Sequence, residues 1–137
     1  MKKLYIVGAG GFGREVLQWA KDIKEIYSDW DIAGFLDDNP RAVDNLNSTH
    51  SVVGSITSWK IELDSVYVIA IGNPKVKQEV VIDFVERGAS FISLIHPSAR
   101  IGANVNLGIG SVVCPNVVLT TDISVGCFVA INVATGV

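Results

Sequence analysis

The residues best suited to chemistry in this 137-residue sequence form a glycine loop, GAGGFG, at Gly8–Gly13. The loop satisfies the pattern G-x-G-x-x-G at Gly8, Gly10 and Gly13. Between a strand and a helix, such glycines let the backbone approach a phosphate, and the helix N-terminus favours the anion. A tight strand-to-helix turn that binds nothing has the same pattern, so the loop alone does not establish a site.

Two other loops carry polar groups where predicted strands end. Asp37 and Asp38 follow the apolar segment 32–36, where a dinucleotide-binding fold places the carboxylate that holds a ribose. Gly72 and Asn73 end the apolar segment 66–72. Ligands of open α/β sheets bind beyond the carboxyl ends of strands, so we expect the three loops to form one pocket. The alternative for Asp37 and Asp38 is a simple turn.

The segments that must position these loops alternate between strand and helix patterns. Apolar runs at 4–7, 32–36, 66–72 and 91–95 predict strands, and 41–51 predicts a polar surface loop. Apolar residues at helical spacing predict helices after the glycine loop and over 75–87, the second ending at Gly88. Alternating strands and helices predict a reduced Rossmann-like α/β unit with a parallel sheet over residues 1–95. In the second helix, the apolar side is expected to be supplied by Val76, Val80, Val81, Ile82 and Phe84.

The last forty residues repeat with a period of six. Large apolar residues occupy every sixth position: Ile95, Ile101, Leu107, Val113, Leu119, Val125, Ile131 and Val137. A series of mostly small or β-branched residues follows four positions later, from Ala99 to Thr135. This period is typical of a hexapeptide β-helix, in which eighteen residues make one coil and the large residue points inward. We therefore predict a parallel β-helix over residues 96–137.

The corners of this β-helix are expected directly after the large apolar residues. The residues at these positions are Gly102, Gly108, Cys114, Thr120, Gly126 and Asn132, of which glycine and asparagine tolerate turn conformations. Residues 101–136 make two coils and Val137 begins a third, without a cap. We expect the natural protein to continue for several coils; the alternative is a two-coil protein with an open strand edge.

Charge and cysteine content exclude several classes of protein. The net charge of −3 argues against a nucleic-acid partner. The sequence contains no run of 18 apolar residues, the length that a membrane-spanning helix needs. Only Arg100 and Asp122 are charged after Ile95, which marks a domain boundary near His96. Cys114 and Cys127 fit no zinc or disulfide pattern, so buried free thiols in a cytoplasmic protein are expected.

Four motifs, in order, resemble bacterial sugar acyltransferases of the sialic acid O-acetyltransferase type: GAGGFGREV, GFLDDNP, AIGNPKV and LIHPSARIG followed by hexapeptides. That family includes the UDP-amino-sugar N-acetyltransferases of surface-glycan synthesis. The resemblance implies an N-terminal domain that binds a nucleotide sugar or sugar. It also implies a left-handed β-helix that forms homotrimers and binds acetyl-CoA between neighbouring subunits, with no metal.

The same resemblance assigns the substrate-binding residues. The loop residues would contact the sugar nucleotide, although many relatives have His at the position of Phe12, so a polar contact is lost there. The carboxylates would contact the nucleotide, and Gly72 would line its pocket with Asn73 beside it. The implied set is Gly10, Gly11, Phe12, Asp37, Asp38, Gly72 and Asn73.

The resemblance also implies a catalytic histidine in the β-helix, in a pattern N-x-x-x-x-x-x-H-[DE]. Asn132 matches its first position, which places the histidine at position 139, so no catalytic residue is expected within the chain. This base would take a proton from the sugar's amine or hydroxyl as that group attacks the thioester. His96 is expected to bond to backbone at the domain junction and His50 to be solvated. A zinc carbonic anhydrase needs three histidines, which this β-helix lacks.

The resulting hypothesis is an acetyl-CoA-dependent sugar acetyltransferase, inactive as this chain alone. Two alternatives remain open. The α/β unit could be a non-catalytic nucleotide- or sugar-binding module that the β-helix only trimerises. The glycine loop taken alone also fits an NAD-binding oxidoreductase domain.

Overall fold

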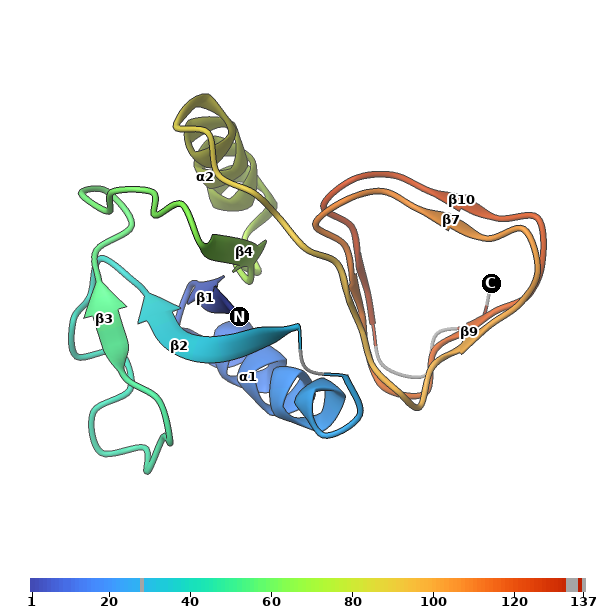
Figure 1. The fold of residues 1–137 in the computed structure, drawn as a ribbon, viewed down its shortest axis with the longest axis horizontal. Coiled ribbons are helices and arrows are strands. Elements are labelled where there is room, and N and C mark those ends of the chain that lie inside the picture. The colour runs from blue at the N-terminus through green and yellow to red at the C-terminus, as the bar shows by residue number, and fades with distance from the viewer. Residues whose placement is uncertain (28, 133–135, 137) are drawn as a thin grey trace.

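The computed structural model describes residues 1–27, 29–132 and 136, and Figure 1 shows a sheet unit beside a triangular set of coils. The sheet is parallel, with strand order β3-β2-β1-β4. Its strands are β1 (Lys2–Val7), β2 (Trp30–Leu36), β3 (Val52–Gly54) and β4 (Ser65–Ile69). Helix α1 (Gly11–Lys24) joins β1 to β2, and helix α2 (Pro74–Glu86) follows β4. The predicted Rossmann-like unit is confirmed, and β3, which the sequence did not predict, is an edge strand at the end opposite β4.

The two helices cover opposite faces of this sheet (Figure 1). Successive side chains of a strand point to opposite faces. Accordingly, Leu4 and Ile6 of β1 belong to the core under α1, whereas Tyr5 and Val7 belong to the core under α2. Full burial of an aliphatic side chain stabilises a fold by about 1.5–3 kcal/mol, so this alternation fixes the register of β1.

Helix α2 is more exposed than the sequence indicated. Phe84 is its one fully buried side chain, while Val80 and Val81 are partly buried. Val76 and Ile82 are exposed, so the expected apolar side is only partly buried. The helix packs by one narrow stripe because it lies over the edge strand β4. Gly88 adopts φ 82° just after the helix, as its predicted end requires.

The segment 91–95, predicted as a single strand, is divided between the two parts of the molecule. Phe91 forms one isolated bridge with Tyr67 of the sheet. The next strand, β5 (Leu94–Ile95), instead pairs with β8 in the coils. Six more two-residue strands follow: β6 (Arg100–Ile101), β7 (Asn106–Leu107), β8 (Val112–Val113), β9 (Val118–Leu119), β10 (Ser124–Val125) and β11 (Ala130–Ile131).

Each coil strand pairs in parallel with the strand one coil later. The pairings are β5-β8-β11, β6-β9 and β7-β10, with Leu94 opposite Val112. These three small sheets form the sides of the triangle in Figure 1. Val113 and Leu119 are buried inside it, as their series predicts, whereas Ile95 is exposed at the open first edge. Thr135 and Val137, the last members of the two series, lie outside the described residues.

The corners lie two residues later than the sequence suggested. Left-handed backbone recurs every six residues, at Asn104, Gly110, Asn116, Asp122 and Phe128, with φ between 56° and 76°. Gly102 is needed for a different reason, because a Cβ atom there would lie 1.6 Å from the backbone oxygen of Thr120 in the next coil. Glycine therefore permits close stacking of the coils at this position.

Candidate functional site

The glycines of the loop have two roles: two of them allow close packing, and two leave space for a ligand. Gly8 has φ 109°, and a Cβ atom on it would lie 2.6 Å from the backbone oxygen of Ala70. A Cβ atom on Gly13 would lie 1.9 Å from the oxygen of Gly8. Nothing lies within 4 Å of the corresponding positions on Gly10 and Gly11. The first and last glycines thus pack α1 against the sheet, while the middle pair leaves the start of α1 open to a ligand.

Asp37 ties this loop to the end of β2. Its Oδ2 atom accepts the backbone N–H of Ala9 at 2.8 Å, and its Oδ1 atom accepts that of Asn39 at 2.8 Å. The bond from Ala9 therefore fixes the position of the glycine loop, and the bond from Asn39 fixes the segment after β2; both are charge-assisted.

Asp38 holds the loop after β3 in a similar way. It accepts hydrogen bonds from Ser55 Oγ at 2.6 Å, Thr57 N at 3.0 Å and Thr57 Oγ1 at 2.8 Å. These bonds, led by that of Ser55, lower the pKa of Asp38, so its carboxylate remains ionised. Both aspartates lie at the expected rim, although the oxygens predicted to meet a nucleotide already have protein partners.

The three predicted loops meet in a pocket of about 430 Å³, here called the rim pocket. Its lining includes every expected residue of this region except Asn73: Gly10, Gly11, Phe12, Asp37, Asp38 and Gly72. Asn73 instead caps α2, because its Oδ1 atom accepts the N–H groups of Lys75 and Val76 at 3.0 and 3.1 Å.

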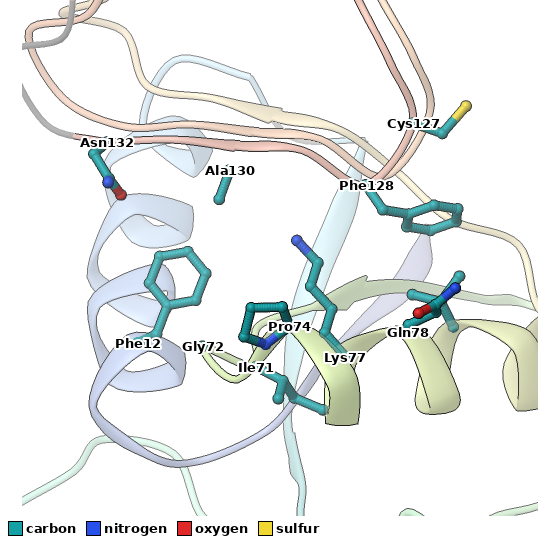
Figure 2. A pocket seen from close by; sticks show the side chains of 11 residues that line it. Phe12, Ile71, Gly72, Pro74, Lys77, Gln78, Cys127, Phe128, Ala130 and Asn132 are labelled. Atoms are coloured by element: carbon teal, nitrogen blue, oxygen red, sulfur yellow. The ribbon is translucent and has the colours of Figure 1, made fainter.

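A second cavity, of about 530 Å³, lies between the sheet unit and the coils and is here called the junction pocket (Figure 2). Phe12, Ile71 and Gly72 line both pockets, which therefore adjoin. Asn132 lines the junction pocket from the coil, together with Cys127, Phe128 and Ala130. Helix α2 contributes Pro74, Lys77, Gln78 and Val81.

Sequence reasoning missed the four residues from α2, although a signal was present. Their spacing of i, i+3, i+4 and i+7 places them on one side of a helix that begins directly after Gly72 and Asn73, which were already assigned to the site. Lys77 is the notable member, because Figure 2 shows its amine reaching from α2 towards the coil. Burial lowers the pKa of this amine.

Aromatic contacts fix the two sides of the junction pocket. Phe12 packs edge-on against Trp19 of α1, with ring centroids 6.0 Å apart. Phe128 packs edge-on against Phe91, with centroids 4.9 Å apart, and so holds a coil corner against the sheet unit. Cys127 beside it is exposed, which corrects the expectation that both thiols are buried; Cys114 is buried.

The two histidines lie outside both pockets. His96 accepts the backbone N–H of Ser98 at Nδ1, as expected, but its Nε2 atom also pairs with Asp22 of α1 at 2.8 Å. His50 was expected to be solvated, but it is partly buried beside Lys21, and burial lowers its pKa. Within the described ranges, no three His, Cys, Asp or Glu side chains are grouped to hold a metal, and no helix could cross a membrane.

Comparison with known proteins relates this geometry to carbohydrate enzymes. Residues 3–84 match the PglD N-terminal domain. A curated relative from Bacillus subtilis (strain 168), UDP-N-acetylbacillosamine N-acetyltransferase, is 28% identical over 115 residues, which are 82% of this chain and 51% of the relative. The chain thus spans about half of that relative's length.

Solved structures match over the whole chain. The acetyltransferase domain of PglB from Neisseria gonorrhoeae FA1090 superposes with a TM-score of 0.84 at 26% identity, covering 100% of this chain and 65% of that domain. WeeI from Acinetobacter baumannii AYE gives a TM-score of 0.80 at 25% identity, covering 100% and 64%. Since the matched domain spans more than half of its residues, this chain belongs to the family of proteins with the PglD N-terminal domain.

Proposed function

We propose that this chain is the nucleotide-sugar-binding part of an acetyl-CoA-dependent acetyltransferase of bacterial surface-glycan synthesis. The enzyme would acetylate an amino or hydroxyl group of a nucleotide-linked or sialic-acid-type sugar. The observation that carries this proposal is the adjoining pair of pockets, which share Phe12, Ile71 and Gly72. A sugar nucleotide has two parts, and the pockets offer each part its own cavity.

The relatives support both the donor and the acceptor. The Bacillus subtilis relative is named as an N-acetyltransferase of UDP-N-acetylbacillosamine, and the Neisseria acetyltransferase domain was also solved in complex with acetyl coenzyme A, at 27% identity to this chain. A GDP-perosamine N-acetyltransferase variant from Caulobacter crescentus, 25% identical, was solved with CoA and GDP-perosamine. These names favour an amino group as the acceptor.

In the rim pocket, the open backbone of Gly10 and Gly11 at the start of α1 would receive the phosphates. Asp37 and Asp38 would position the surrounding loops and face the nucleoside. The sugar would then extend past Gly72 into the junction pocket, where Asn132 lies. There the acceptor would attack the thioester carbonyl, lose its proton to a general base, and release the CoA thiolate.

The coils would serve assembly and donor binding. We propose that they are the first turns of a left-handed parallel β-helix spanning residues 96–137, with residues 1–95 as the substrate domain. Strand β5 would then be the point where the first domain enters the second. Ile109 and Val118 are exposed apolar residues of the coils, as expected at contacts between subunits of a homotrimer. Such an enzyme would work in the cytoplasm.

The test is acetyl transfer by the protein as its gene encodes it. The enzyme would be incubated with acetyl-CoA and a panel of UDP-amino-sugars and sialic acids, and free CoA thiol would be measured. We expect turnover with at least one amino-sugar nucleotide. No turnover with any member of the panel would contradict the proposal.

A specific observation keeps a second candidate, a non-catalytic binding module. None of the described residues that line the junction pocket is a histidine or a carboxylate. A binding module would bind the same nucleotide sugars without consuming acetyl-CoA. The enzyme predicts both binding and turnover, so the transfer assay separates the two.

A further inference from the structure

Lys77 occupies the inner side of α2, facing the coils. Asn73 caps this helix, and Lys77 lies one turn further along, on the same side as Gln78 and Val81. Figure 2 shows its side chain crossing the junction pocket towards the coil segment that carries Phe128 and Ala130. The amine therefore stands where the two parts of the molecule meet.

The amine of Lys77 lacks a counter-charge among the described residues. Among the described residues, no carboxylate lies within ion-pair distance of Lys77 and no side-chain hydrogen bond involves it. By contrast, Lys24 bonds to the oxygen of Trp30 and pairs with Asp31. A partly buried ammonium group without a partner is unfavourable, and burial already lowers the pKa of Lys77. A bound anion would offset this penalty.

The charges of the residues that line the two pockets also favour an anion bound at Lys77. The rim pocket contains two carboxylates, Asp37 and Asp38, and no lysine or arginine among its described lining residues. In the junction pocket, Lys77 is the single charged residue among those described. A diphosphate bound beside two carboxylates would be repelled unless a cation balances its charge.

We infer that Lys77 recognises an anionic oxygen group of the substrate in the junction pocket, and so selects acidic sugar substrates over neutral ones. The inference rests on the proposed function and adds a specificity-determining residue to it. Two substrate groups have this chemistry. One is the sugar-side phosphate of the diphosphate, where a sugar nucleotide extends from the rim pocket past Gly72 into the junction pocket; the other is the carboxylate of a sialic-acid-type sugar.

The test compares Lys77→Met with Lys77→Arg and with Lys75→Met. Lys75 is a matched control, because it lies on the same helix, is exposed and lines neither pocket. Calorimetric titration would use UDP, UMP, UDP-N-acetylglucosamine, N-acetylneuraminic acid and the methyl ester of that acid. Methionine keeps most of the length of the side chain and removes its charge, so the unfolding midpoint of Lys77→Met should equal or exceed that of the parent chain.

We expect Lys77→Met to bind its acidic ligand about tenfold more weakly or worse, since a charged hydrogen bond is lost. Lys75→Met should bind as the parent does, and Lys77→Arg should recover most of the affinity. A loss for UDP that exceeds the loss for UMP assigns the diphosphate. A loss for the free acid but not for its methyl ester assigns the carboxylate.

Cys127 provides an independent readout, because this residue lines the edge of the same pocket and is exposed to reagents. The ligand that Lys77 recognises should slow alkylation of Cys127 in the parent chain and do so less in Lys77→Met. Equal binding of every ligand by parent and Lys77→Met would overturn the inference and leave the proposed function standing. Failure of the parent to bind any of these ligands would overturn both.

Discussion

The Nε2 atom of His96 lies 2.8 Å from the Oδ2 atom of Asp22 and joins the first corner of the coils to helix α1. The Nδ1 atom of the same ring accepts the N–H of Ser98, so Nε2 carries the proton that is donated to Asp22. This contact links the sheet unit to the coils on the side of α1. On the other face of the sheet, Phe91 and Phe128 make the corresponding link.

We predict that Asp22→Asn lowers stability in a pH-dependent way. The hydrogen bond from His96, with a smaller one from Gln18, lowers the pKa of Asp22. A lowered carboxyl pKa adds stability above the ordinary aspartate range, and this stability is lost as pH falls through the folded value. Because the side chain is about one-third exposed, the loss at pH 7 should be about 0.5–1 kcal/mol after solvent screening.

Urea unfolding at several pH values checks this prediction. The difference between Asp22→Asn and the parent should shrink below about pH 4. Asp44→Asn is the control, because Asp44 is exposed and its carboxylate makes no hydrogen bond to a described residue. A difference that is constant from pH 7 to pH 3 would contradict the assignment.

Gly102 and Gly126 both directly follow a large apolar residue of the coils. Substitution of Gly102 should disturb the stacking of the coils, whereas substitution of Gly126 should be tolerated. In Gly102→Ala, the new methyl group would meet the backbone oxygen of Thr120 at 1.6 Å, and overpacking of this kind costs about 1–3 kcal/mol. In Gly126→Ala, the nearest atom would be a Val129 methyl carbon at 3.9 Å. The free energy of unfolding should therefore fall only in Gly102→Ala; equal losses would show that stacking is not the reason.

The glycine loop should show a similar division between stability and binding. Gly13→Ala would place a methyl carbon 1.9 Å from the oxygen of Gly8 and should destabilise the chain by about 1–3 kcal/mol. Gly11→Ala has open space and should unfold like the parent, but its methyl group would stand where a phosphate approaches α1. Unfolding and UDP titration of both variants check this, and unchanged UDP affinity in Gly11→Ala would argue against phosphate binding there.

The two thiols should differ widely in reactivity. Burial, with a smaller effect of Glu15, raises the pKa of Cys114 to about 11, so little thiolate forms at neutral pH. Cys127 is exposed. Iodoacetamide at pH 8 should label one cysteine in the folded chain and two in urea, and peptide mass spectrometry should assign the first to Cys127. Faster labelling of Cys114 would contradict the described packing of the coils.

Most of the fold could be predicted from the sequence because the apolar residues of its two parts recur with different periods. Burial of Val113 and Leu119 follows from the six-residue series, and the sheet follows from apolar runs separated by helices. Strand β3 was missed because three residues of an edge strand carry no measurable period. The corners were misplaced because the left-handed backbone falls at residues such as Asn104 and Asp122. Composition alone did not show that these positions, and not the glycine positions, form the corners.

The candidate site was predictable only where it lies on loops. Gly10, Gly11 and Asp37 follow strands, and their meeting at one rim is a property of parallel sheets. Lys77 and Phe128 line one pocket because the coils lie beside α2, an arrangement that no local pattern specifies. Likewise, Asn73 caps α2 and does not line the pocket, and this depends on where α2 begins.

The central claim is that the rim pocket receives the nucleotide of a sugar nucleotide. Titration of the chain with UDP-N-acetylglucosamine and with NADH, followed by tryptophan fluorescence, tests it most directly, because Phe12 of the pocket contacts Trp19. We predict saturable quenching by the UDP-sugar and none by NADH beyond its own absorbance. Saturable binding of NADH without any response to the UDP-sugar would contradict the claim and favour an oxidoreductase domain.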